Sequence, residues 1–177
     1  EDIVLRCGDK SLSYGALFQG ILQAEAGLRA LGVGPGELVT LFSLNTPEAV
    51  MAFYAIDRIG AVANWVDMKV SPAEVEEYLT QAGSRVALVL EVAFSKVYHH
   101  RGKAPTQHFV VLPLAPYVAP ELEGKLHLST WQQGAGPDCL SWADFLRPPA
   151  QVPPEADRWE EPVAITYTGG TTGPAKG

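Results

Sequence analysis

Hydrophobic residues recur at helical spacing between Ser13 and Gly32. The apolar positions fall three or four residues apart, at Tyr14, Leu17, Phe18, Ile21, Leu22 and Leu28. Such spacing gathers them on one face, which predicts an amphipathic helix over residues 14–30. Ser13 is a suitable N-cap residue, and Gly32 follows where a helix stop is expected.

A second helix is predicted over residues 47–59. Thr46 precedes Pro47, and proline is tolerated at the first position of a helix. The residues that follow are apolar nearly all round. This helix should therefore be largely buried before Gly60 ends it.

A capping box predicts a third helix over residues 72–82. The run Ser71-Pro72-Ala73-Glu74 combines an N-cap serine, a proline at the first helical position and a glutamate three residues after the serine. Gly83 supplies the stop. Shorter helical segments are expected at residues 94–98 and 142–146, the latter capped by Ser141.

Short apolar runs rich in strand-favouring residues lie between these helices. They predict strands at residues 38–42, 61–66, 85–90, 109–112 and 163–167. Strands that alternate with helices are joined by right-handed crossovers, so we expect an α/β fold with a mostly parallel sheet flanked by helices. Prolines interrupt the pattern in two predicted loops, at about residues 113–120 and 147–157.

Composition restricts the class of protein. The chain has 177 residues, of which 47% are hydrophobic, enough for one domain or a large subdomain. No apolar run is long enough for a membrane span, and no basic and then apolar N-terminal stretch indicates a secretory signal, so we expect a cytoplasmic protein. The net charge of −7, without a cluster of Lys or Arg, argues against a nucleic-acid partner.

Cysteine, histidine and tryptophan do not form a recognisable site in the sequence. Cys7 and Cys139 lie in no C-x-x-C pattern and are expected to be packing residues. The histidines lack metal-ligand spacing, which leaves the metal content open and places them on the surface or in loops: His99, His100, His108 and His127. The tryptophans are expected to pack: Trp65, Trp131, Trp142 and Trp159.

The last ten residues, 168–177, carry the strongest chemical signal. The candidate nucleotide-binding residues in this segment are Thr168, Gly169, Gly170, Thr171, Thr172, Gly173 and Lys176. Glycines let backbone N–H groups approach an anion closely, threonine hydroxyls add donors, and the lysine adds a positive charge. A Walker A motif does not fit, because Gly177 rather than Ser or Thr follows Lys176.

Residues 167–177 resemble the phosphate-loop motif [YF]-T-[SG]-G-[ST]-T-G-x-P-K-G of the adenylate-forming superfamily, which includes acyl-CoA synthetases. Two positions differ from its commonest form, because Gly169 stands where serine is usual and Pro174-Ala175 replaces the usual x-Pro. Upstream segments are also similar to the superfamily in sequence order: Leu12–Leu17, Leu31–Val39, Asn45–Glu48 and Ala55–Asn64. We call residues 168–177 the phosphate loop from here on.

The resemblance implies an ATP-dependent ligase, acyl-CoA synthetase-like and associated with fatty acid metabolism. Such an enzyme uses Mg2+ and ATP to adenylate a carboxylic acid, releases pyrophosphate, and transfers the acyl group to a thiol such as coenzyme A. The adenine, ribose and metal contacts of the superfamily lie after the phosphate loop. Residues 1–177 are therefore expected to be an incomplete N-terminal subdomain of the large domain, inactive alone and without a catalytic residue. A noncatalytic nucleotide-binding or assembly module with the same fold is the alternative.

Overall fold

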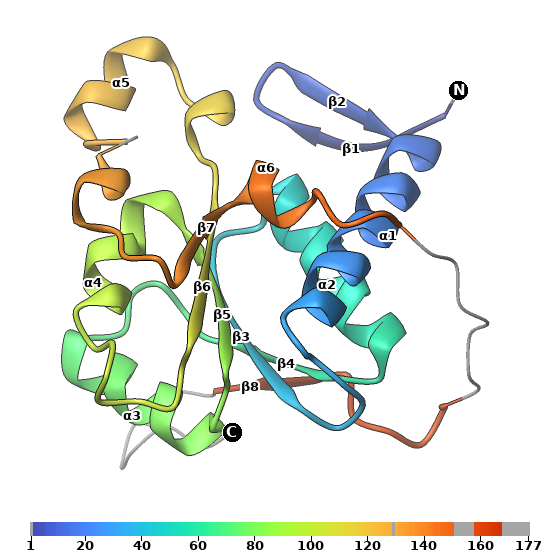
Figure 1. The fold of residues 1–177 in the computed structure, drawn as a ribbon. Coiled ribbons are helices and arrows are strands. Elements are labelled where there is room, and N and C mark those ends of the chain that lie inside the picture. Colours follow the sequence, from blue (N-terminus) through green and yellow to red (C-terminus); the bar gives the residue numbers. More distant parts are fainter. Residues whose placement is uncertain (1, 129, 151–157, 168–177) are drawn as a thin grey trace.

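A computed structural model describes residues 2–128, 130–150 and 158–167 of the chain. Its centre is a six-stranded sheet in the order β7-β6-β5-β3-β4-β8, in which every neighbouring pair is parallel (Figure 1). The strands are β3 (Leu38–Phe42), β4 (Val62–Trp65), β5 (Val86–Leu90), β6 (His108–Leu112), β7 (Cys139–Ser141) and β8 (Ala164–Thr166). The predicted α/β fold with a mostly parallel sheet is confirmed.

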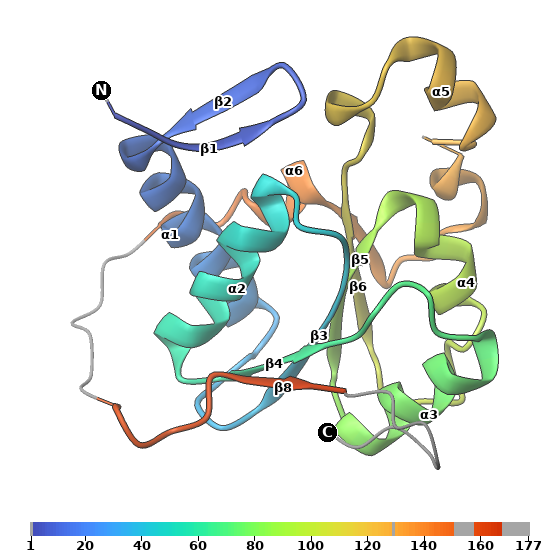
Figure 2. The same cartoon turned by 180° about the vertical axis from the view of Figure 1, so that it is seen from behind.

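Helices cover both faces of this sheet, as Figures 1 and 2 show from opposite sides. One face carries α1 (Tyr14–Ala30), α2 (Pro47–Ile59) and the short α6 (Trp142–Phe145). The other carries α3 (Pro72–Ala82) and α4 (Phe94–Tyr98). All five predicted helices are therefore present.

Alternation along β5 explains why the sheet has two separate cores. Leu88 and Leu90 point into the cluster beneath α1 and α2, whereas Ala87 and Val89 point into the cluster beneath α3 and α4. Successive side chains of a strand face opposite sides of its sheet, so a strand covered on both faces must be apolar throughout. All five residues of β5 are buried accordingly.

The predicted N-caps begin the three long helices. The side chains of Ser13, Thr46 and Ser71 each accept a hydrogen bond from the backbone N–H three residues later. Glu74 also accepts a hydrogen bond from the N–H of Ser71 at 2.7 Å, which completes the capping box. Local capping chemistry therefore fixes where these helices start.

Several elements were not predicted. A hairpin of β1 (Ile3–Cys7) and β2 (Lys10–Ser13) precedes α1, and α5 (Pro120–Lys125) follows the first proline-rich loop. Short 3-10 turns form at Glu91–Ala93, Ala115–Tyr117 and Trp131–Gly134. Residues 147–150 of the second predicted loop belong to no helix or strand, whereas residues 151–157 and the phosphate loop lie outside the described residues.

Two predicted locations were wrong, and a third holds only in part. His100 lies in the turn that follows α4, as expected of a loop residue, but it is buried, with 5% of its surface exposed, and its Nδ1 lies 3.0 Å from Glu76 Oε2. His108 begins β6 instead of lying in a loop. Trp159 is 92% exposed rather than packed. No helix in the described part of the chain is long and apolar enough to cross a membrane.

Candidate functional site

The carboxyl ends of the parallel strands form one edge of the sheet, here called the carboxyl edge. β3 and β5 are neighbours, yet β3 leads into α2 on one face and β5 leads towards α4 on the other. Open α/β sheets bind ligands at points where the outgoing chains of neighbouring strands diverge in this way. This edge is thus the first place to look for a site.

β8 ends at the same edge, and Tyr167 and then the phosphate loop follow it in the sequence. It runs parallel to β4, with Ile165 opposite Asn64 and Thr166 opposite Trp65. Its chain therefore leaves the sheet at the carboxyl edge. In the sequence, the phosphate loop begins directly after Tyr167. The candidate nucleotide-binding residues lie outside the described residues: Thr168, Gly169, Gly170, Thr171, Thr172, Gly173 and Lys176.

Tyr167 is fixed by a ring stack on α3. Its ring lies 4.1 Å from that of Tyr78, centroid to centroid, with an interplanar angle of 25°. Tyr78 is 5% exposed, and burial raises the pKa of both phenols. Both hydroxyls therefore stay protonated near neutral pH, so this pair has a packing role rather than an acid–base role.

Lys96 holds the loop between β4 and α3. Its ammonium donates to the carbonyl oxygens of Met68, at 3.0 Å, and of Val70, and it lies 5.6 Å from the centroid of the Phe42 ring. No sequence pattern indicates this role, because the contacts join residues more than 25 positions apart. Lys96 thus organises backbone at the carboxyl edge.

Two glutamates at this edge are tied to the chain that follows β6. Glu91 Oε2 accepts the backbone N–H of Leu114 at 3.0 Å and that of Ala115 at 3.4 Å. Glu48 Oε1 accepts the hydroxyl of Tyr117 at 2.7 Å, and burial together with this contact raises the pKa of Tyr117. Both carboxylates therefore hold the edge together structurally.

A buried polar chain crosses the sheet beneath α3. Asn64 Nδ2 donates to Thr40 Oγ1 at 3.0 Å, and Thr40 Oγ1 donates to Ser84 Oγ at 2.9 Å. Thr106 Oγ1 donates to the carbonyl oxygen of Ser84 at 3.0 Å. Buried polar groups require such partners, so the chain locks β4, β3 and the start of β5 into one arrangement.

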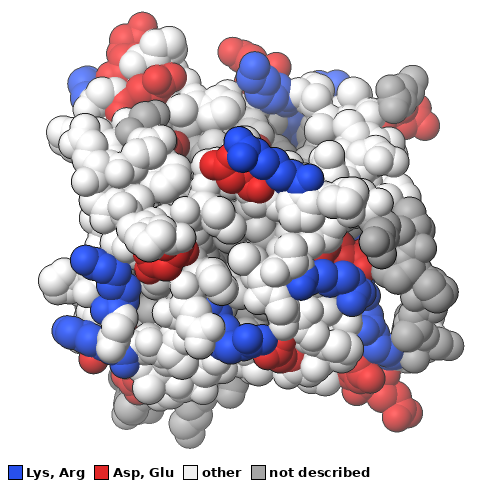
Figure 3. Space-filling view, in the orientation of Figure 1, with Lys and Arg blue, Asp and Glu red and all other residues white. Residues whose placement is uncertain are grey.

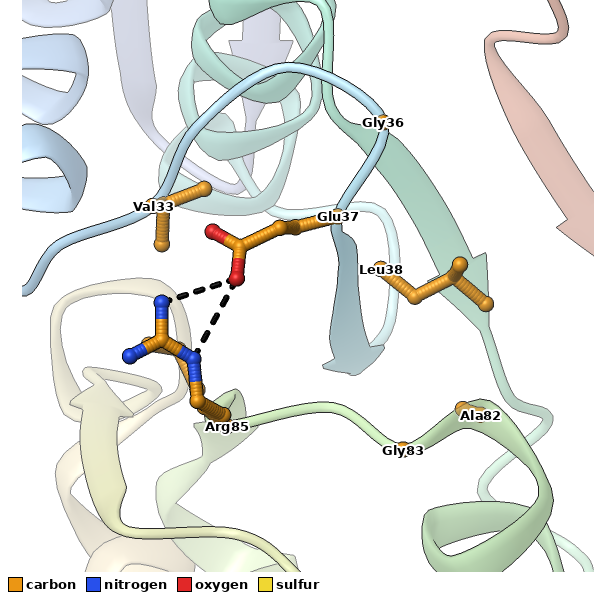
Figure 4. Close-up of a pocket in the computed structure, with 8 residues that line it drawn as sticks. Val33, Gly36, Glu37, Leu38, Ala82, Gly83 and Arg85 are labelled. Atoms are coloured by element: carbon orange, nitrogen blue, oxygen red, sulfur yellow. Dashed lines mark hydrogen bonds and ion pairs between the residues drawn. The ribbon is translucent and has the colours of Figure 1, made fainter.

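A cavity of about 290 Å³ lies at the opposite, amino edge of the sheet (Figure 4). Arg85 and Glu37 line it and face each other, with Arg85 Nη2 2.8 Å from Glu37 Oε1. Glu37 Oε2 also accepts the N–H of Gly34 at 2.7 Å, which with Arg85 holds the pKa of Glu37 below its ordinary value of 4.5. The two charged groups already pair with each other, so the carboxyl edge rather than this cavity is the candidate site.

Within the described ranges, the other reactive groups form no second site. The residues that the structure describes contain no group of three or more His, Cys, Asp or Glu that could hold a metal ion. Burial raises the pKa of Cys139, which disfavours a reactive thiolate. On the face shown in Figure 3, the described Lys and Arg side chains are scattered among acidic and uncharged residues.

The chain is similar in sequence to known proteins over nearly all of its length. The model of a family described as AMP-binding enzyme matches residues 1–177. The chain is 29% identical to an acetyl-coenzyme A synthetase of Pseudoalteromonas atlantica, over 94% of the chain. It is 32% identical to a long-chain-fatty-acid–CoA ligase of Thermus thermophilus, over 93% of the chain.

Solved structures agree with the fold. The anthranilate CoA ligase AuaEII, in complex with anthranoyl-AMP, superposes with a TM-score of 0.81 at 25% identity and covers 98% of this chain. MbtA of Mycobacterium smegmatis superposes with a TM-score of 0.76 at 24% identity, again over 98% of the chain. The chain spans 26% and 27% of the length of the two synthetases named above, and 30% of the AuaEII chain.

Proposed function

Because this chain belongs to the AMP-binding enzyme family, we propose that it is part of an ATP-dependent ligase that joins a carboxylic acid to coenzyme A. Two of the relatives, an acetyl-coenzyme A synthetase and a long-chain-fatty-acid–CoA ligase, support the reaction class. The structure with bound anthranoyl-AMP supports an acyl-adenylate as the intermediate. In this proposal residues 1–177 form a subdomain that carries the phosphate loop.

One observation supports this proposal most directly. β8 ends at the carboxyl edge of a parallel sheet, and the Gly- and Thr-rich segment 168–177 follows it immediately. Backbone amides of such a segment can surround an anion, and the carboxyl edge is where parallel sheets bind nucleotides. We assign the phosphates of ATP to residues 168–173 and Lys176.

The first reaction step requires charge stabilisation rather than a protein nucleophile. An oxygen of the substrate carboxylate attacks the α-phosphorus of ATP, the bond from that phosphorus to the bridging oxygen breaks, and pyrophosphate leaves with the electron pair. Lys176 at about 4 Å from a phosphate oxygen contributes about 4 kcal/mol at an effective dielectric of about 20. The amides and hydroxyls of the phosphate loop must share the remaining charge.

In the second step the thiol sulfur of coenzyme A attacks the acyl carbonyl carbon, and AMP leaves with the electron pair of the broken C–O bond. The nucleotide enters as Mg-ATP, so the metal ion arrives with the substrate. The described residues offer no cluster for a resident ion, and we assign it no ligand from this chain. A cytoplasmic enzyme that activates fatty acids is the specific form we propose.

Pyrophosphate exchange tests the proposal. The full-length enzyme that contains this chain is incubated with ATP, labelled pyrophosphate and one acid at a time: acetate, a long-chain fatty acid and an aromatic acid. Acid-dependent incorporation of label into ATP is expected for at least one acid, followed by acyl-CoA formation when coenzyme A is added. ATP binding without exchange for any acid would instead support a noncatalytic nucleotide-binding module.

A further inference from the structure

The short edge strand β8 cannot set its own register. It contains three residues, and within the described part of the chain it pairs with β4 alone. A slip by one residue moves a strand by about 3.3 Å and turns each side chain to the opposite face of the sheet. Since β8 leads into the phosphate loop, its register decides where that loop begins.

Arg158 anchors the chain before β8. Its Nη2 donates to the backbone carbonyl oxygens of Asp57 and Arg58, at the last turn of α2. A cation at this end of a helix also complements the helix dipole. Gly60 leaves room for the guanidinium, because a Cβ atom at residue 60 would overlap Arg158 Nη1. The segment entering β8 is thereby attached to a buried helix.

The stack of Tyr167 on Tyr78 anchors the chain after β8. Tyr78 belongs to the core cluster beneath α3, and Tyr167 packs against that cluster from outside. Ile165 lies opposite Asn64, which faces the same side of the sheet as Thr40, its hydrogen-bond partner. Tyr167, two residues further on, reaches this side as well. With the register shifted by one residue, its ring would turn away from α3.

We propose that Tyr78 is a positioning residue for the bound nucleotide. Through its stack on Tyr167 it fixes the register of β8 and the direction in which the chain leaves the sheet, while Arg158 fixes the other end. This inference rests on the proposed function, because it assigns the nucleotide phosphates to the segment that follows Tyr167. Small displacements of binding groups weaken contacts strongly, so losing the stack should impair ATP binding.

The test separates positioning from stability in the full-length enzyme. The substitution Tyr78→Leu removes the ring but keeps an apolar side chain, whereas Tyr78→Phe keeps the ring and removes only the hydroxyl. We expect Tyr78→Leu to raise the KM for ATP about threefold to tenfold, the range that corresponds to an aromatic pair. The KM for the acid should stay unchanged, and Tyr78→Phe should restore the KM for ATP. A merely structural role would reduce the active fraction, and hence the apparent kcat, without changing the KM for ATP.

Tyr98→Leu is the matched control. Tyr98 is buried to the same extent as Tyr78, with 5% of its surface exposed, and belongs to the same core cluster. Its ring pairs with Phe94 and Phe109 instead of Tyr167. Its hydroxyl also donates to Asp138 at 2.9 Å, so the control should be destabilised at least as much. An equal rise in the KM for ATP in Tyr98→Leu would overturn the inference.

Hydrogen–deuterium exchange provides a second readout. Amides of residues 163–167 should exchange faster in Tyr78→Leu than in the unmodified enzyme, whereas those of β3 should not. If Tyr78→Leu does not fold, Tyr167→Leu removes the same stack from the half-buried side and should give the same changes. An unchanged KM for ATP in the folded variant, in an enzyme that is active, contradicts the inference. If the unmodified enzyme shows no pyrophosphate exchange, only the proposed function is contradicted. The Kd for Mg-ATP of the unmodified enzyme, compared with that of Tyr78→Leu, then tests the inference.

Discussion

Glu25 and Arg58 form a buried ion pair that joins α1 to α2. Arg58 Nε donates to Glu25 Oε2 at 2.8 Å, and the two side chains are 10% and 1% exposed. The other carboxylate oxygen accepts two N–H groups of Arg29, at 3.0 and 2.9 Å. Both oxygens of Glu25 are therefore satisfied inside the layer of helices that covers one face of the sheet.

Removing one partner of this pair should be strongly destabilising. Glu25→Ala leaves the Arg58 charge without its carboxylate, so we expect the free energy of unfolding to fall by about 3–5 kcal/mol. Arg29→Ala is the control, because the Arg29 side chain is 44% exposed; its loss should lie at about 0–1 kcal/mol. Urea denaturation measures both. Equal losses of unfolding free energy in the two variants would contradict the larger cost expected for breaking the buried Glu25–Arg58 pair.

The buried polar chain beneath α3 gives a second prediction. Thr40→Val keeps the shape of the side chain but leaves Asn64 Nδ2 and Ser84 Oγ without the Thr40 hydroxyl. We expect a loss of about 1–3 kcal/mol in the free energy of unfolding, the cost of buried polar groups without partners. Thr80→Val, on the exposed side of α3, should change it by no more than about 0.5 kcal/mol. A loss for Thr40→Val no larger than the control would contradict the argument.

Local chemistry explains which parts of the fold could be predicted. The helices at 14–30, 47–59 and 72–82 match the structure residue for residue, because their caps lie within a few positions of the chain. The β1–β2 hairpin was missed because both strands are short and partly exposed, which blurs the alternation of hydrophobic residues. The contact between buried His100 and Glu76 joins residues 24 positions apart, and no local pattern encodes such a contact.

In the candidate site, too, local features could be predicted from the sequence and long-range ones could not. The phosphate loop was predicted from its own composition and stays a prediction, because it lies outside the described residues. The strand predicted before it, at residues 163–167, is present as β8 and pairs in parallel with β4. The divergence of β3 and β5 depends on the order of strands in the sheet. Strand order is set by packing between distant segments, so neither this divergence nor the contacts of Lys96 could be derived from the sequence.

Lys176 and Thr172 should bind ATP in the full-length enzyme. Lys176→Ala and Thr172→Val each remove one proposed phosphate contact, so each should raise the KM for ATP or slow adenylation by about tenfold to a hundredfold. Lys125→Ala is the control, because Lys125 is exposed on α5. Pyrophosphate exchange measures the effect. Unchanged exchange in both variants would remove these residues from the site.

Stability should depend on pH through Glu37. The N–H of Gly34, together with Arg85, lowers the pKa of Glu37 from its ordinary value of 4.5. A carboxylate with a lowered pKa in the folded state stabilises the fold fully above pH 4.5, and this contribution is lost as the pH falls through the lowered pKa. Glu37→Gln should thus be less stable than the unmodified chain at neutral pH, with the difference shrinking in acid. Urea denaturation of both proteins across this pH range measures the difference in stability. An equal difference at every pH would contradict the prediction. Glu160→Gln is the control, because Glu160 is exposed.

Two glycines that end helices should respond differently to the same substitution. Gly60 ends α2 and Gly83 ends α3, with φ angles of 83° and 62°. Alanine at either position meets the strain of a left-handed backbone, about 1–2 kcal/mol. At Gly83 the added Cβ has open space, whereas at Gly60 it would overlap Arg158 Nη1.

Gly60→Ala should therefore be the more destabilising of the two, because it displaces Arg158 from the last turn of α2 as well as straining the backbone. The backbone strain is common to both variants, so their difference reports the contribution of Arg158 together with the contact of the added Cβ with Pro35 Cβ at 3.4 Å. In an Arg158→Met background the guanidinium contacts are already lost, so Gly60→Ala and Gly83→Ala should differ less than in the unmodified chain. Thermal denaturation of the four variants and their parents measures this coupling. If the gap between the two glycine substitutions is unchanged in the Arg158→Met background, Arg158 does not hold the chain that enters β8.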